Sequence, residues 1–146
     1  RCTARLLARA EQVCAAQHAR LTDQRREVLA CIAQSHHAVG AYDIIDRLAG
    51  QGPRPAPITV YRALDFLTAR GLVHKVESRN AFVACLHSHA GSAAALLVCE
   101  RCGTVDELDC ASALQALQAA AAAHGFATTR AVIELSGTCA SCAVGG

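Results

Sequence analysis

Two Cys-x-x-Cys pairs are the feature that most constrains this chain. The first is Cys99 and Cys102 in "CERCG", and the second is Cys139 and Cys142 in "CASC", with 36 residues between the pairs. Four thiolates in two short turns are the donor set and local spacing of a tetrahedral structural zinc site. Because the intervening residues are enough for a helix and a strand, we expect the ion to join the beginning of a small domain to its end.

Disulfide bonds and redox chemistry are the alternative explanations of these pairs. A redox Cys-x-x-Cys stands at a helix N-terminus, where its first thiol is activated, whereas we expect both pairs at strand ends. The chain has nine cysteines, an odd number, among segments that resemble regular helices and strands, so a disulfide framework is disfavoured. The cysteines without paired spacing are expected to be ordinary buried or half-buried thiols: Cys2, Cys14, Cys31 and Cys110.

Apolar residues at helical spacing predict helices through the first half of the chain. They cover residues 3–19, the segment after a predicted N-cap at Thr22, a short helix between Gly40 and Gly50, and residues 57–70, which follow a proline-rich connector. The apolar runs "LVHKVES" and "AFVAC", separated by polar residues, predict a β-hairpin. Helices followed by a two-stranded wing predict a winged helix-turn-helix with residues 57–70 as the recognition helix.

The second half predicts a small α/β unit. "ALLVC" and "TVDEL" are expected strands on either side of the first cysteine pair, "SALQALQAAAAAHGF" is an expected helix, and "TRAVIELSG" is an expected strand leading into the second pair. The fold class is therefore α+β, with a winged-helix DNA-binding domain at residues 1–84 and a dimerisation and metal-binding domain at residues 85–146. So small a second domain is expected to pair with its copy in a homodimer.

Charge and hydropathy restrict the partners of the chain. No apolar run reaches the roughly 18 to 20 residues of a membrane span and no signal sequence is recognisable, so we expect a soluble cytoplasmic protein without a membrane partner. A formal charge of +2 is too small to indicate nucleic acid by itself. The predicted recognition helix is more informative, because Tyr61 and Arg62 lie opposite its apolar face, and an outward aromatic residue beside arginine favours contact with DNA.

Six segments resemble the ferric uptake regulator family of bacterial metal-dependent repressors. They are "RLTDQRREVL", "AYDIIDRL", "TVYRALDFL", "GLVHKVESRNAFVAC", "CERCG" and "CASC", in the order the family has them, and the resemblance covers residues 10–142. It implies a zinc-responsive transcriptional regulator that represses zinc uptake genes. Such a regulator binds a palindromic double-stranded operator as a zinc-loaded dimer, with two dimers per operator in some cases.

The resemblance also implies two zinc ions per chain, one structural and one regulatory. The regulatory ligands, mapped by motif to the hinge between domains, are His74, Cys85, His89 and Glu107. His87 is the alternative to His89, which we favour because it leaves more chain to fold back on Cys85. A mixed nitrogen, sulfur and oxygen set suits zinc, and its thiolate disfavours a plain iron or manganese site.

DNA contacts are implied in the same way. Tyr61 and Arg62 would contact base edges and thymine methyl groups, while Arg20, Arg25, Arg26 and Tyr42, at or near helix starts, would contact phosphates. Asp46 and Arg47 are candidates for contacts between two dimers, although Ala49 stands where the family pattern has a basic partner.

Three alternatives compete with this interpretation, and two of them come from other classes of protein. A sister regulator of the same family would sense iron, manganese or peroxide, and Cys85 disfavours it. An enzyme would need an open metal position or a low-pKa thiol in a cleft, and no such constellation is recognisable. A zinc adaptor that binds only protein would keep both cysteine pairs, but would not need "TVYRAL" on an outward helix face.

Overall fold

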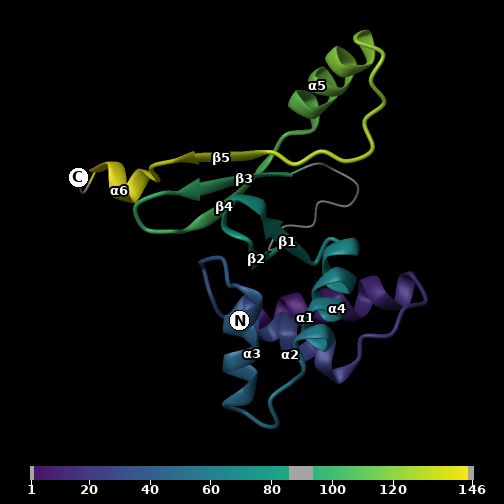
Figure 1. The fold of residues 1–146 in the computed structure, drawn as a ribbon, viewed down its shortest axis with the longest axis vertical. Helices are drawn as coiled ribbons and strands as arrows, with labels where there is room; N and C mark the ends of the chain where they lie inside the picture. The colour runs from purple at the N-terminus through teal and green to yellow at the C-terminus, as the bar shows by residue number, and fades with distance from the viewer. Residues whose placement is uncertain (1, 86–93, 145–146) are drawn as a thin grey trace. The chain divides into compact units, whose positions relative to one another are not determined.

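The computed structural model describes residues 2–85 and 94–144 (Figure 1). The chain forms two compact units, residues 1–86 and residues 87–146, each with its own sheet. The expected domain boundary between residues 84 and 85 stays a prediction, because residues 86–93 lie outside the described part of the chain.

Four helices build most of the first unit. They are α1 (Cys2–Ala16), α2 (Asp23–Ala33), α3 (Ala41–Ala49) and α4 (Pro57–Ala69). The predicted cap is confirmed, since the Thr22 hydroxyl accepts a hydrogen bond from the Arg25 amide at 3.3 Å. The prediction that the first helix reaches residue 19 is wrong. His18 has φ +52°, and the Ala19 amide donates to the Cys14 carbonyl at 2.8 Å, which closes the helix end.

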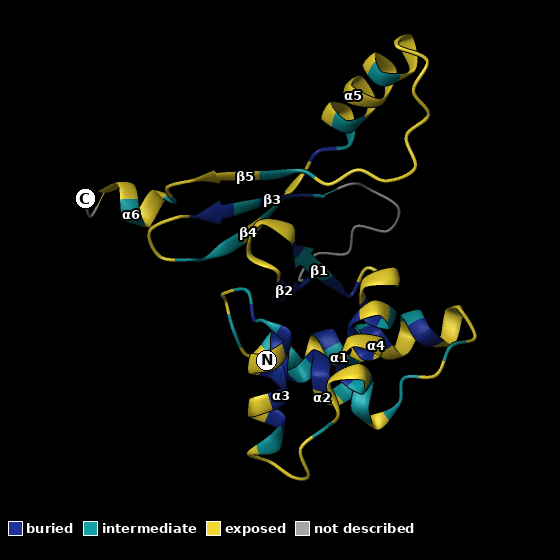
Figure 2. Ribbon diagram, viewed as in Figure 1, coloured by how far each residue is buried: buried dark blue, intermediate teal, exposed yellow. Residues whose placement is uncertain are grey.

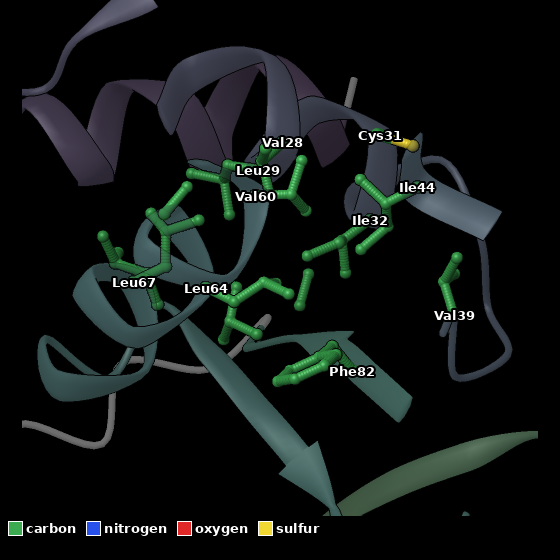
Figure 3. Close-up of a cluster of buried hydrophobic side chains, with 14 of the residues drawn as sticks. Val28, Leu29, Cys31, Ile32, Val39, Ile44, Val60, Leu64, Leu67 and Phe82 are labelled. Carbon is green, nitrogen blue, oxygen red and sulfur yellow. The ribbon is translucent and has the colours of Figure 1, made fainter. Parts of the chain in front are cut away.

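A cluster of nineteen buried residues forms the core of the first unit. Figure 3 shows how side chains of α2, α3 and α4 point toward one another in this cluster, with Phe82 beneath them. The predicted faces of α4 are confirmed. The buried face carries Val60, Ala63, Leu64 and Leu67, whereas Tyr61, Arg62 and Asp65 are exposed.

A two-stranded antiparallel sheet, the wing, completes the first unit. It pairs β1 (Val73–Val76) with β2 (Ala81–Ala84), in the register Val73 opposite Ala84. The first strand is shorter than predicted because η1 (Glu77–Arg79) forms a 3-10 turn, which Asn80 closes with φ +47°. Val39 adds a single antiparallel bridge to Phe82. The expected helices and hairpin thus assemble into the winged helix-turn-helix.

The second unit is a three-stranded sheet with two helices. Its elements are β3 (Ala94–Cys99), β4 (Val105–Asp109), α5 (Ala111–Ala123), β5 (Glu134–Gly137) and α6 (Ala140–Val144). The strand order is β4-β3-β5, with β3 antiparallel to β4 and parallel to β5. Cys99 is the register partner of Gly137. The first and the last strand of the unit's sequence therefore finish at the same end of the sheet.

Three predictions for the second unit need correction. The helix ends at Ala123 instead of residue 126, because Gly125 turns the chain with φ +73°. The last strand covers only residues 134–137 of the predicted 129–137, since its register with β3 begins at Glu134. The short helix α6 was not predicted.

The two units differ in how much apolar surface they bury (Figure 2). No residue of α5 is buried, and large apolar side chains of the second unit are exposed: Leu108, Leu117, Phe126, Val132, Leu135 and Val144. The α+β fold class is confirmed. Among the described helices, none has the length and apolar character needed to cross a membrane.

Candidate metal centres and nucleic-acid interface

The two cysteine pairs meet at the end of the β3–β5 pairing. The sulfur atoms of Cys99, Cys102, Cys139 and Cys142 all lie within 4.8 Å of one another. The Cys102 and Cys139 sulfurs are 3.7 Å apart. A tetrahedron with zinc–sulfur bonds of about 2.3 Å has edges of about 3.8 Å. The four donors therefore fit a closed, four-coordinate zinc site.

The turn between β3 and β4 orients the first pair. The Cys99 amide donates to the Thr104 carbonyl at 3.0 Å, and the Gly103 amide donates to the Cys99 carbonyl at 2.9 Å. Gly103 adopts φ +77°, a conformation that a residue with a Cβ atom reaches only at a cost. This glycine lets the chain reverse tightly enough for both thiols to face the same point.

Hydrogen bonds at the cluster favour thiolates at the first pair. Backbone amides of Cys102 and Cys139 lower the pKa of Cys99 to about 6, and the Cys139 amide lies 3.3 Å from its sulfur. The Thr104 hydroxyl lowers the pKa of Cys102, with its oxygen 3.1 Å from the sulfur. The neighbouring sulfurs of Cys139 and Cys102 instead raise the pKa of Cys142 to about 12. Four thiolates this close need a cation among them, and a divalent metal would supply it.

Two contacts that the sequence analysis missed hold the cysteine turns together. The Arg101 Nη1 atom donates to the Cys142 carbonyl at 2.9 Å, and the Glu100 amide donates to the Gly137 carbonyl at 2.8 Å. Both residues lie inside the first Cys-x-x-Cys, and this position is the only signal that could have identified them.

The expectation that both pairs stand at strand ends is correct only for the first. Cys99 ends β3, but Cys139 directly precedes α6, and the Ala143 amide donates to its carbonyl at 2.9 Å. The described cysteines form no disulfide bonds with one another, and Cys14, Cys31 and Cys110 are buried, as expected. Convergence of four sulfurs, more than position relative to strands, distinguishes this cluster from a redox pair.

The wing brings two of the predicted regulatory ligands together. His74 on β1 is opposite Val83, and Cys85 follows β2, opposite Leu72. Diagonal neighbours on one face of an antiparallel pair lie within reach of each other, and a ring nitrogen of His74 is within 4.8 Å of the Cys85 sulfur. Cys85 is buried and His74 is half-buried.

Two further predicted regulatory ligands are not residues of the wing. Glu107 is a half-buried residue of β4 in the second unit, opposite Leu96. His89, and its alternative His87, lie outside the described residues. The complete regulatory set therefore stays a prediction.

Exposed tyrosines mark one face of the first unit. Tyr61 on α4 and Tyr42 in the first turn of α3 are 41% and 62% exposed, and Arg62 is exposed beside Tyr61. The two tyrosines line one hollow with Gly40, Asp43 and Asn80. Asn80 was not identified from the sequence, although a polar residue in a wing turn is a recognisable signal.

The predicted phosphate-contacting arginines have partners within the first unit. Arg25 and Arg70 both place the guanidinium carbon 3.6 Å from the centroid of the Phe66 ring. They must occupy opposite ring faces, since two such groups cannot share one position. Arg25 also donates to the Arg20 carbonyl at 2.5 Å, and Arg26 forms an exposed ion pair with Glu11 at 2.6 Å. Their contact with DNA stays a prediction.

Asp46, a candidate for contacts between dimers, also has a partner within the chain. Arg54 of the proline-rich connector donates to Asp46 Oδ1 at 2.9 Å, and both side chains are largely exposed. No sequence pattern predicted this pair. An exposed ion pair of this kind contributes little to stability and exchanges readily with other partners.

Comparison with known proteins identifies relatives of this chain by sequence and by structure. Residues 16–136 match the model of the Ferric uptake regulator family. The chain is 46% identical over 142 residues to the zinc uptake regulation protein of Escherichia coli (strain K12), which covers 96% of this chain and 82% of that protein. A solved structure of a zinc uptake regulator complexed with zinc and DNA matches with a TM-score of 0.91 and 43% identity, over 97% of this chain and 95% of that one. The crystal structure of holo XcZur matches with a TM-score of 0.87 and 42% identity, over 94% and 96% of the two chains. The chain therefore belongs to the ferric uptake regulator family, whose members are transcription regulators and not enzymes.

Proposed function

We propose that this protein is a zinc-responsive transcriptional repressor of zinc uptake genes that acts in the cytoplasm. It binds palindromic operator DNA as a zinc-loaded homodimer. The observation that carries the proposal is the likeness, over nearly the whole chain, to a regulator whose structure contains both zinc and DNA. The four-sulfur cluster and the exposed Tyr61–Arg62 face are the features of this chain that agree with it.

Each chain holds two zinc ions in this proposal. Cys99, Cys102, Cys139 and Cys142 hold the structural ion, and the 3.7 Å sulfur separation supports that assignment. His74, Cys85, His89 and Glu107 hold the regulatory ion, and the proximity of His74 to Cys85 supports half of that set. A closed four-thiolate site stabilises the fold, whereas a mixed ligand set allows the ion to exchange.

The first unit recognises the operator. Arg62 donates to purine edges in the major groove, and the Tyr61 ring packs on a thymine methyl group. Tyr42 and the three arginines Arg20, Arg25 and Arg26 contact phosphates and set the register of the protein on the duplex. The exposure of Tyr61, Arg62 and Tyr42 supports these roles.

A homodimer forms through the second unit. The exposed apolar side chains of that unit, among them Leu117 on α5 and Leu135 on β5, support an interface there. Binding of two dimers to one operator is a further part of the proposal. In such an assembly Asp46 would exchange its Arg54 partner for a basic residue of the neighbouring dimer.

The wing links metal to DNA binding. His74 lies in the sheet that follows the recognition helix and Cys85 directly follows its second strand, so ligation of both restrains that sheet. A regulatory ion can favour the DNA-binding arrangement only by the difference in its affinity for that arrangement over others. The ion would act only by coordinating its ligands, and it would take part in no reaction.

The decisive experiment combines metal analysis with operator binding at buffered free zinc. We expect one tightly held zinc per chain and a second that switches DNA binding between picomolar and nanomolar free zinc. Cys85→Ala should abolish the zinc response while the protein keeps its tightly held ion. Cys14→Ala, which changes another buried thiol of the same unit, is the matched control.

Two results would count against the proposal. Operator binding by Cys85→Ala with the unchanged zinc response would refute the regulatory site. A DNA-binding response to iron or manganese, or its loss on exposure to peroxide, with no response to zinc, would identify the alternative, a sister regulator of the same family.

A further inference from the structure

We propose that Arg9 of α1 is a positioning residue for the zinc ligand Cys85, an inference that rests on the proposed regulatory site. The Arg9 guanidinium donates a hydrogen bond from Nη2 to the carbonyl oxygen of Cys85. The two residues are 76 positions apart in the sequence, so the bond joins the first helix to the end of the wing. Neither a sequence motif nor a predicted DNA contact explains this hydrogen bond.

Cys85 needs a restraint because it lies just beyond the regular strand. β2 ends at Ala84, and the Cys85 amide makes the last ladder bond, to the Leu72 carbonyl at 2.9 Å. Arg9 binds the carbonyl of the same residue. The Cys85 backbone is thus held at its amide and at its carbonyl, which fixes the direction in which its thiol points toward His74.

Arg9 is itself held firmly. Its neighbours on α1, Leu6 and Ala10, are 4% and 0% exposed and belong to the core cluster of the first unit. The Arg9 side chain is half-buried. A charged donor makes a stronger hydrogen bond than a neutral one. Because α1 packs against the core, the backbone that carries the Arg9 side chain is held in place.

A partner of this kind is expected to affect metal affinity. Groups that orient metal ligands typically change affinity by about 10-fold to 100-fold when removed. Loss of the Arg9 bond should therefore weaken metal binding at Cys85 by a factor in that range.

The test uses the full chain, loaded at its structural site, and Co²⁺ as the probe for the regulatory site. Thiolate-to-cobalt charge-transfer absorption reports binding at Cys85. Arg9→Gln removes the charge, Arg9→Lys keeps it, and Arg5→Gln is the matched control, an exposed arginine one turn earlier on α1. We expect Arg9→Gln to raise the Co²⁺ concentration at half-saturation about tenfold. Arg9→Lys should recover most of that loss, and Arg5→Gln should titrate like the unchanged protein.

Two outcomes overturn the proposal. One is an Arg9→Gln titration that matches the unchanged protein. The other is a loss of cobalt affinity that Arg9→Lys does not recover and that accompanies a lower thermal midpoint of the first unit, because it indicates a general role in folding. A failure of the regulatory site itself is seen separately, since Cys85→Ala would then keep the thiolate-to-cobalt charge-transfer absorption.

Discussion

The two units of this chain are stabilised in different ways. The first unit buries nineteen residues in one cluster drawn from four helices and the wing. The second unit buries few side chains, has a helix with no buried residue, and exposes large apolar groups. Burial of apolar area is the main source of stability in the first unit. In the proposed function, the second unit depends on zinc at its four thiols and on a partner surface.

This difference suits a regulator whose DNA-binding half must persist when zinc is scarce. A first unit that folds without metal can lose its regulatory ion and still keep the recognition helix intact. The structural cluster is closed by four donors, so it should keep its ion at zinc levels that empty a mixed site. Substitutions in each unit test this separation.

Cys99→Ala should have the largest effect. It removes one of four zinc ligands, and structural zinc contributes about 10 kcal/mol or more to the folding of small zinc domains. We expect loss of the tightly held zinc and a much lower thermal midpoint for the second unit, while the helices of the first unit persist. Metal analysis and far-ultraviolet circular dichroism measure both.

Cys110→Ala is the control for this change, because Cys110 is buried in the same unit but lies outside the cluster. It should keep its zinc. Loss of helical signal from the whole chain in Cys99→Ala would show that the first unit is not independently stable.

Leu29→Ala should have the next largest effect, and it should destabilise the first unit instead of the second. Leu29 on α2 is 0% exposed, and truncating a buried leucine costs about 3 to 5 kcal/mol. We expect a lower thermal midpoint for the first unit with unchanged zinc at the four-cysteine cluster. Ile58→Ala, at a 61% exposed position of α4, should change stability by about 0.5 kcal/mol or less. Loss of zinc from Leu29→Ala would show that the units fold together.

Leu117→Asp tests the partner surface of the second unit. Leu117 is 59% exposed on α5, and a carboxylate there would lose its water on dimer formation. We expect the dimer dissociation constant to rise at least about tenfold, because one desolvated charge per protomer costs more than 1.4 kcal/mol. Sedimentation velocity measures the change, with Gln118→Asp, the next residue on the helix, as the control. An unchanged dissociation constant would place the interface elsewhere.

The smallest predicted effect is the pH dependence of the metal-free second unit. The ordinary cysteine pKa is 9.0, and amide hydrogen bonds lower the pKa of Cys99 to about 6. This thiolate stabilises the fold fully above pH 9, and that contribution is lost as the pH falls to 6. The raised pKa of Cys142, about 12, acts in reverse and removes stability above pH 9. Thermal unfolding of chelator-treated protein should show maximal stability near pH 9, and a flat profile from pH 6 to 9 would contradict the assignment for Cys99.

The sequence predicted the parts of the fold that depend on local patterns. Helical spacing identified the buried and exposed faces of α4, and the Cys-x-x-Cys spacing identified all four thiols that converge. The helix α6 was missed because five residues give too short a pattern to recognise. The late start of β5, at Glu134, was missed because strand length depends on pairing with β3, which lies far away in the sequence.

Contacts between distant residues of the sites were not predictable. The stack of Arg25 and Arg70 on Phe66, and the bond from Arg9 to Cys85, join positions with no shared motif. Helical spacing places Phe66 and Arg70 one turn apart, but it does not show that Arg25 approaches from another helix. Such contacts follow from helix packing, which a one-dimensional pattern does not specify.

The parallel pairing of β3 with β5 has a consequence for the synthesis of the protein. At about 5 to 20 residues per second, the ribosome needs about 2 to 7 seconds to make the 36 residues that separate the cysteine pairs. During that interval the β3–β4 hairpin can form, but one edge of β3 has no neighbouring strand. Cys99 and Cys102 also lack the second cysteine pair. Open strand edges invite association with other chains, and exposed thiols are open to oxidation. The most vulnerable period for this protein therefore precedes its completion.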